Sequence, residues 1–284
     1  MQKSVIFLLC LLLTPALCVG ETIRSKSVRV KTLDPDVPLS SAVRGGGGGG
    51  HDANCWSSYW TFIGAITMKT ASNAKLNAPQ TGDASFSVVV GFMPDAYSFQ
   101  GVISKGTSDG SGNLEWWFHL NSNKDVVSRY SNDGSTIRGG VYGDLYYAGA
   151  KSILMESWED VGADYDWLVA GIPDSTGTGT ISSTLTSSQT KPVYEGGGDF
   201  RLGAASSGIS YLQGKLYFVA IYHNNLSIQD MEDIYDGTKH PADDFEDDIT
   251  FYIDFHQKVG STYTSEIGNI TFSISGTGTP VAGP

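Results

Sequence analysis

The chain has 284 residues, of which 40% are hydrophobic and 17% are charged, and it contains 18 Lys and Arg against 30 Asp and Glu. The formal charge of −12 argues against nucleic acid as a partner, because so acidic a surface repels a phosphate backbone. It suits neutral sugars or divalent cations better, and the length is enough for one large domain with an ample apolar interior.

The first twenty residues have the layout of a secretory signal peptide. Lys3 is followed by an apolar run from Val5 to Leu13 and by small residues before Glu21. We therefore predict cleavage near Gly20 and a secreted protein, extracellular or at the cell surface. No second apolar stretch is long enough to span a bilayer, so no membrane insertion is expected. Loss of the signal peptide leaves Cys55 as the one remaining cysteine, so no disulfide is expected within the chain.

Residues 21–55 show little hydrophobic periodicity and include a glycine-rich stretch. Pro35 and Pro38 interrupt the first part, and six consecutive glycines run from Gly45 to Gly50. Such sequence has much conformational entropy to lose and few side chains to bury, so we predict a flexible N-terminal arm. The arm is either a passive spacer or the contact between copies in a homo-oligomer.

Residues 56–284 are predicted to form one all-β domain. Short alternating stretches are separated by clusters of Gly, Asn, Asp and Ser, which is typical of antiparallel strands and turns. Four apolar side chains share one face of the first clear strand: Phe86, Val88, Val90 and Phe92. This pattern favours two sheets packed face to face.

The strand predicted over residues 114–120 has two different faces. One face carries Leu114, Trp116, Phe118 and Leu120, and the other carries Glu115, Trp117 and His119. An aromatic ring can stack on the apolar face of a sugar, and a carboxylate can accept hydrogen bonds from its hydroxyls. We therefore predict Glu115, Trp117 and His119 as a glycan-binding platform. The alternative is that Trp116 and Trp117 both pack, one in each layer.

A strand over residues 216–222 and one short helix over residues 227–236 follow each other. Both faces of the strand are apolar, which predicts burial on both sides: Leu216, Phe218, Ala220 and Tyr222 on one, and Tyr217, Val219 and Ile221 on the other. Ser227 and Asp230 have the spacing of a capping box, and Gly237 has the position of a left-handed C-cap. Closing strands are predicted over residues 249–255 and 270–274, where apolar residues alternate again.

Several short pieces between about residues 60 and 280 occur in a characteristic order. They are Phe86-Ser87-Val88 with Phe92 and Pro94, Val102 to Lys105, Trp158 with Val161, Tyr165 and Asp166, Leu202-Gly203, Gly214-Lys215-Leu216, Tyr222 to Ser227, and Ile234 to Gly237. In this order of motifs the chain resembles the laminin G-like and concanavalin A-like lectin/glucanase superfamily. The resemblance implies a jelly-roll β-sandwich of two antiparallel sheets, with the tail paired near residues 62–68. The same fold hosts lectins, adhesion modules and hydrolases, so it implies no particular ligand.

Glycosidases of this superfamily place carboxylates at alternate positions of one strand, in the pattern E.D..E, so that two of them flank the glycosidic bond. The pattern is absent here. Neither Glu156, Glu159, Asp160 and Asp164 nor residues 243–248 are expected to alternate within an apolar frame, and the second group is predicted to be a solvated loop. We expect a non-catalytic protein, with a divergent glycoside hydrolase or lyase as the alternative.

The resemblance also implies calcium, because many laminin G-like domains bind it through loop oxygens. The candidate ligands are Asp109, Asn113, Asp133 and Asp199, which all lie on predicted loops. The function expected from the sequence is a secreted carbohydrate-binding or adhesion module that recognises a glycan or an extracellular protein. A structural subunit of an extracellular assembly, joined through the arm, is the alternative.

Overall fold

The structure is a computed structural model that describes residues 55–78, 85–107, 114–173, 181–190, 193–205, 210–255, 261–276 and 281–282. The predicted signal peptide and nearly all of the predicted arm, residues 1–54, lie outside the described residues. None of the helices in the described part has the length and apolar character that a membrane crossing needs.

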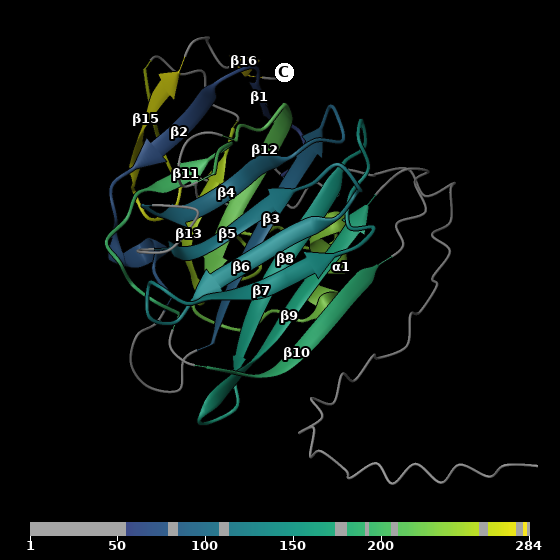
Figure 1. The fold of residues 1–284 in the computed structure, drawn as a ribbon. Helices are drawn as coiled ribbons and strands as arrows, with labels where there is room; N and C mark the ends of the chain where they lie inside the picture. The colour runs from purple at the N-terminus through teal and green to yellow at the C-terminus, as the bar shows by residue number, and fades with distance from the viewer. Residues whose placement is uncertain are drawn as a thin grey trace, which may run out of the picture.

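Two antiparallel sheets make up the domain (Figure 1). Sheet A contains, in order, β10 (Ser182–Thr190), β9 (Asp164–Pro173), β8 (Ser152–Asp160), β3 (Phe86–Pro94), β12 (Gly214–Tyr222), β1 (Trp60–Phe62) and β16 (Val281–Ala282), and β13 (Ile249–Asp254) also pairs with β12. Sheet B contains β14 (Thr262–Thr264), β15 (Thr271–Gly276), β2 (Ile66–Thr70), β11 (Phe200–Leu202), β4 (Gln100–Gly106), β5 (Leu114–Leu120), β6 (Val126–Ser131) and β7 (Ile137–Tyr142). With one short α-helix, α1 (Ile228–Tyr235), and one 3-10 turn at Ala74–Leu76, the described residues confirm the predicted all-β sandwich.

The main hydrophobic core lies between the sheets. As predicted, the alternating apolar residues of β3 all join it: Phe86, Val88, Val90 and Phe92. Sheet B contributes Trp116 and Phe118 of β5 to the same core. The alternation of a strand directs every second side chain to one face, so removal of this face from water holds the two sheets together.

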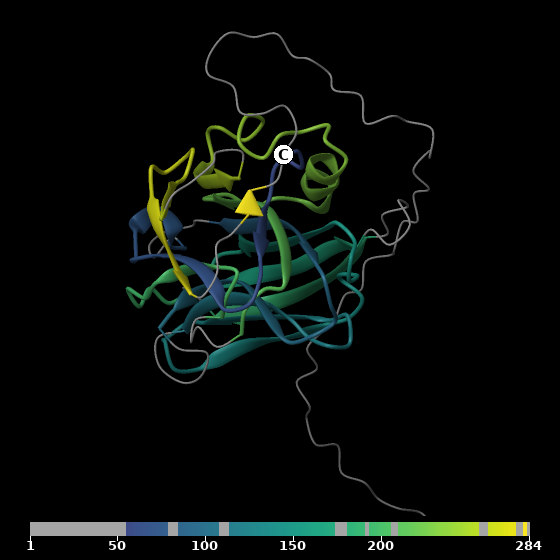
Figure 2. The ribbon, with the colours of Figure 1, turned by 90° about the horizontal axis from the view of Figure 1, so that it is seen from above.

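A second apolar cluster lies between sheet A and the helix. Met231 and Ile234 of α1 pack with Ala220 and Tyr222 of β12, and Trp56 joins them. Figure 2 shows α1 on the outer side of the two sheets. Because β12 has apolar neighbours on both faces, both faces are buried, as the sequence predicted.

One detail of β12 differs from the prediction. The pairing of β12 with β3 shifts between Leu216 and Phe218, which is the mark of a β-bulge. Leu216 therefore belongs to the core between the sheets, whereas Phe218 faces the helix side with Ala220. The prediction that Leu216 and Phe218 share a face is wrong, because a bulge reverses the alternation at that point.

The C-terminal part returns to the start of the domain. β15 pairs antiparallel with β2, so that Ile274 lies opposite Met68 and Gly276 opposite Ile66. This confirms the predicted pairing of the tail near residues 62–68. The returning strand ties the ends of the domain into both sheets, since β16 also pairs with β1.

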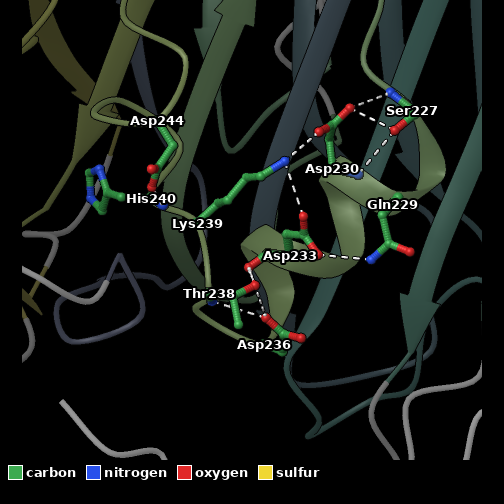
Figure 3. Close-up of polar contacts among 9 residues, drawn as sticks. All are labelled: Ser227, Gln229, Asp230, Asp233, Asp236, Thr238, Lys239, His240 and Asp244. Carbon is green, nitrogen blue, oxygen red and sulfur yellow. Dashed lines mark hydrogen bonds and ion pairs between the residues drawn. The ribbon is translucent and has the colours of Figure 1, made fainter. Parts of the chain in front are cut away.

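Helix α1 has the predicted capping box (Figure 3). The hydroxyl of Ser227 accepts a hydrogen bond from the backbone N–H of Asp230 at 3.2 Å, and the Asp230 carboxylate accepts one from the backbone N–H of Ser227 at 2.9 Å. Lys239 then bridges the carboxylates of Asp230 and Asp233 at 2.8 and 3.0 Å. The helix ends at Tyr235, and Gly237 follows the C-cap with a φ of 77°, where a residue without Cβ is favoured. Asp230 and Asp233 thus help to stabilise the helix.

We expect Ser227→Ala to lower the free energy of unfolding by about 1 kcal/mol, because the N-cap hydroxyl satisfies a backbone N–H of the first turn that has no partner within the helix. Ser227→Gly is the matched control, since glycine at an N-cap costs only a few tenths of a kcal/mol by the same scale. Urea unfolding of the three chains measures the difference. Equal midpoints for Ser227→Ala and the unchanged chain would show that the box contributes nothing.

Candidate functional site

The glycan platform predicted on β5 is not exposed. Glu115, Trp117 and His119 are 1%, 3% and 0% exposed. β5 lies inside sheet B between β4 and β6, and the burial of these three side chains shows that the face that points away from the core is covered. The alternative interpretation is the one that the structure supports, because Trp116 packs in the core between the sheets while Trp117 is buried outside that core.

Glu115 is the extra residue of a β-bulge between β4 and β5, and an ion pair occupies its carboxylate. The partner is the ammonium of Lys105, which is itself fully buried. The backbone N–H of Gly198 donates a further hydrogen bond to Glu115 at 3.1 Å. Burial raises the pKa of Glu115 and lowers the pKa of Lys105, and the attraction between the two charges opposes both shifts. These contacts give Glu115 a role in stability.

Trp117 and His119 are covered by two other side chains. The guanidinium carbon of Arg129 lies 5.6 Å from the ring centroid of Trp117, and the rings of Trp117 and His119 are 3.9 Å apart. Phe99 meets His119 edge to face, with 5.0 Å between the ring centroids. Phe99, on the loop between β3 and β4, is therefore the exposed ring of this series.

Two of the four candidate calcium ligands, Asp109 and Asn113, lie outside the described residues. A third, Asp133, already accepts several hydrogen bonds in the turn between β6 and β7. They come from the backbone N–H groups of Ser135 at 2.8 Å and Thr136 at 2.6 Å, and from the hydroxyl of Thr136 at 2.8 Å. These bonds favour the ionised carboxylate and hold the pKa of Asp133 well below its usual range. Asp133 thus has a turn-forming role.

The fourth candidate, Asp199, forms ion pairs with Arg201 at 3.0 Å and with Lys69 at 3.9 Å. Within the described ranges, no group of three or more His, Cys, Asp or Glu side chains has the arrangement of a metal site. Calcium binding therefore stays a prediction.

Glu156 corrects one expectation about the acidic residues. It alternates on β8 with Leu154 and Trp158, which both belong to the core between the sheets, so it does lie in an apolar frame. Its side chain is fully buried, and neither carboxylate oxygen has a hydrogen-bond partner among the described residues. Burial raises the pKa of Glu156 well above its ordinary value. The acidic residues 243–248 form a largely exposed turn region, as predicted.

Exposed aromatic rings mark a different candidate site. Among the described residues, the large apolar side chains that stay exposed include two aromatic ones, Tyr97 at 40% and Phe99 at 54%. Both lie on the loop that joins β3 to β4, residues 95–99. Exposed aromatic rings supply large contact areas with little side-chain entropy to lose, so they are suited to bind a ligand.

Two further loops hold this aromatic loop in place. The backbone N–H of Gly149 donates to the carbonyl of Pro94 at 2.6 Å, and the ring of Tyr97 lies 5.7 Å from that of Tyr146. The ammonium of Lys124, in the β5–β6 loop, lies 5.8 Å from the ring centroid of Tyr97 and 4.8 Å from that of Tyr147. We refer to residues 95–99, 121–125 and 143–151 together as the aromatic rim.

The backbone of the rim is strained at two positions. Lys124 and Asp144 have positive φ values of 67° and 56°, although neither is glycine. Such conformations cost free energy and persist where the surrounding structure fixes them. At Lys124 the fixing groups are the side-chain oxygen of Asn121, which accepts from the N–H of Asp125 at 3.2 Å, and the N–H of Leu145, which donates to the Lys124 carbonyl at 3.3 Å.

The sequence contains one signal for the rim. After Pro94 the chain reads DAYSFQG, in which two aromatic residues stand among turn residues instead of within an apolar alternation. An aromatic residue in such a loop has no predicted core to enter. Only the structure shows that Phe99 also covers His119, because this contact joins the β3–β4 loop to strand β5.

Comparison with known proteins gave no family model and no curated protein that matches the chain. Among solved structures, the chain is similar to the CBM40 domain of the Ruminococcus gnavus IT-sialidase bound to α2,3-sialyllactose, with 12% identity, a TM-score of 0.42, and 58% of this chain and 91% of that chain covered. It is also similar to a native heptameric SAP-like pentraxin from Limulus polyphemus, with 10% identity, a TM-score of 0.36, and coverage of 64% and 82%. A third is the binding domain of botulinum neurotoxin DC, at 9% identity, a TM-score of 0.39, and coverage of 61% and 40%. Similarity at this level carries no inference about ligand, and laminin G-like kinship stays a prediction.

Proposed function

We propose that this chain is a secreted, non-catalytic module that binds carbohydrate through the aromatic rim. The observation that carries the proposal is the pair of exposed rings, Tyr97 and Phe99, on a loop that two neighbouring loops hold in position. A pyranose offers an apolar face for stacking and hydroxyls for hydrogen bonds. The amide of Asn123 and the carboxylates of Asp95 and Asp144 are exposed on the same loops and can serve those hydroxyls.

The positions of three carboxylates outside the aromatic rim are consistent with a non-catalytic module. Glu115 and Asp199 are taken up by ion pairs, and Glu156 lies in the core. A glycosidase needs two carboxyl groups that can both reach the substrate. Glu156 is fully buried, so it cannot flank a glycosidic bond in this conformation.

We expect Tyr97→Ala and Phe99→Ala each to weaken glycan binding by about tenfold, because a stacked ring contributes about 1 kcal/mol or more beyond its buried area. The measurement is a glycan array followed by calorimetry on the best ligand. Tyr97→Phe keeps the ring and is expected to keep most of the affinity. Val161→Ala is the matched control, because Val161 is 49% exposed but lies in the β8–β9 turn, at the opposite end of β8 from the rim.

The proposal fails if no glycan binds, or if a glycan binds equally well to the unchanged chain and to the double variant of Tyr97 and Phe99. The array is run with calcium and again with a chelator, since calcium remains a proposed cofactor. Glycan binding that is present with calcium and lost with the chelator would support calcium as a cofactor.

An extracellular protein is the second candidate ligand, and strand β7 is the observation that favours it. β7 is the last strand of sheet B and carries exposed Ile137 and Val141. An edge strand with exposed apolar side chains is suited to add a partner strand. Val141→Lys is expected to weaken such a protein contact and to leave glycan binding unchanged.

A further inference from the structure

Two basic side chains of the β5–β6 hairpin lie over aromatic rings. Lys124 places its ammonium over Tyr97 and Tyr147. Arg129 lies over Trp117, and the rings of Trp117, His119 and Phe99 form a continuous series with centroid distances of 3.9 and 5.0 Å. Each exposed ring is thus connected through aromatic contacts to a cation.

Neither Lys124 nor Arg129 has a carboxylate of the described residues within ion-pair distance. Other basic groups of the chain do have such partners: Lys105 pairs with Glu115, Lys239 with Asp230 and Asp233, and Arg201 with Asp199. Acidic residues outnumber basic ones by 30 to 18 in the full sequence, so carboxylates are plentiful. Lys124 lies beside the exposed Tyr97, and Arg129 lies further along the hairpin over Trp117. Both contact rings instead of carboxylates, so either cation can accept an anionic group from a ligand.

The position of Lys124 is fixed by its turn. The side-chain oxygen of Asn121 accepts from the N–H of Asn123 at 2.8 Å and from that of Asp125 at 3.2 Å, and the N–H of Asn121 donates to the carbonyl of Asp125 at 3.0 Å. This network holds Lys124 at a φ of 67°, which a lysine rarely adopts. The backbone of Lys124 is therefore already ordered, so binding of an anion costs no backbone entropy at this residue.

The charges around the rim limit the kind of anion. Asp95, Asp125 and Asp144 each lie on one of the three loops of the aromatic rim, and the formal net charge of the chain is −12. A densely charged polyanion would meet these carboxylates along its length and would be repelled. A sugar with a single carboxylate can place that group on Lys124 or Arg129 and its apolar face on Tyr97 or Phe99.

We infer that the ligand of the aromatic rim is an acidic sugar, a pyranose with one carboxylate, whose carboxylate Lys124 or Arg129 binds while an exposed ring stacks on the pyranose. The inference rests on the proposed carbohydrate-binding function and specifies its ligand. The guanidinium of Arg129 can hold a carboxylate with two parallel hydrogen bonds, and the ammonium of Lys124 acts as a point charge.

The test compares sugar acids with their own methyl esters, which keep the ring and remove the charge. Glucuronate, galacturonate and N-acetylneuraminate, each beside its methyl ester, are titrated into the full chain by NMR. At least one acid is expected to bind about tenfold more tightly than its ester, with the difference shrinking as salt is raised. Either Lys124→Gln or Arg129→Gln, whichever removes the cation that holds the carboxylate, is expected to weaken binding of the acid by about tenfold and to leave binding of the ester unchanged.

Lys215→Gln is the matched control, because Lys215 also lies over an aromatic ring, that of Tyr59 at 4.2 Å, but on sheet A. It is expected to change neither titration. The inference is overturned if every acid and its ester bind equally, or if none of them binds while a neutral glycan binds through Tyr97. In those cases the proposed function still stands. If no glycan, acidic or neutral, depends on Tyr97 or Phe99, the proposed function falls as well.

Discussion

Replacing Glu115 with methionine is expected to lower the free energy of unfolding by about 3–5 kcal/mol, because the substitution leaves the ammonium of Lys105 buried without its counter-ion. The side chains of Glu115 and Lys105 are 1% and 0% exposed. After the substitution, the ammonium of Lys105 keeps the hydroxyl of Ser72, at 3.5 Å, as a neighbour but loses the carboxylate. The pKa of Lys105 is already lowered by burial, so we expect the remaining lysine to lose its proton in the folded state.

The measurement is a double-mutant cycle by urea unfolding with Glu115→Met, Lys105→Met and the pair together. The double variant is expected to recover most of the lost stability, because two apolar side chains replace the ion pair at similar volume. The double variant also provides a result if either single variant fails to fold. Unfolding of Glu115→Met at the same urea concentration as the unchanged chain would show the prediction to be wrong.

The sequence was sufficient to predict those features that depend on neighbours along the chain. Alternation predicted the inward face of β3, and the spacing of Ser227 and Asp230 predicted the start of α1. Both signals are local: a strand alternates with a period of two, and a capping box spans four residues. The pairing of the tail with β2 came from the family resemblance instead, since it joins residues about 200 positions apart.

The candidate site could not be predicted in the same way. Alternation correctly placed Trp117 and His119 on the face opposite Trp116, but it cannot tell whether that face is covered. The cover comes from Arg129 on β6 and from Phe99 on the β3–β4 loop, and both residues lie outside the strand whose alternation was considered. The bulge in β12 is another case, because a single extra residue reverses the alternation without changing the composition.

Replacing Glu156 with glutamine is expected to stabilise the fold above about pH 5, and increasingly so as the pH rises. Glu156 is fully buried, and neither of its carboxylate oxygens has a hydrogen-bond partner among the described residues. Burial raises its pKa well above 4.5 in the folded chain, so the folded state holds a proton that the unfolded state releases. Glutamine has nearly the same shape and cannot ionise.

The direction follows from this difference in bound protons. Below pH 4.5 the carboxyl is protonated in both states, so the two chains should have similar pH dependence. As the pH rises from 4.5 toward the raised pKa, unfolding releases a proton, and the stability of the unchanged chain falls by about 1.4 kcal/mol per pH unit from this group. Above the raised pKa the carboxylate is ionised in both states and the difference is constant. Urea unfolding of both chains between pH 4 and pH 8 measures the separation of the two curves.

Glu159→Gln is the matched control, since Glu159 lies three residues further along β8 and is exposed. The curve of Glu159→Gln should stay parallel to that of the unchanged chain, and a parallel curve for Glu156→Gln would contradict the prediction.

The Glu156→Gln variant also tests whether Glu156 takes part in catalysis. If Glu156 were a catalytic acid that reaches substrate when the sheets part, Glu156→Gln would abolish an activity on polysaccharide. For a binding module with its ligand at Tyr97 and Phe99, glycan affinity should be unchanged while the stability rises. Stability and binding then respond to different residues, because the core and the rim are separate parts of the sandwich.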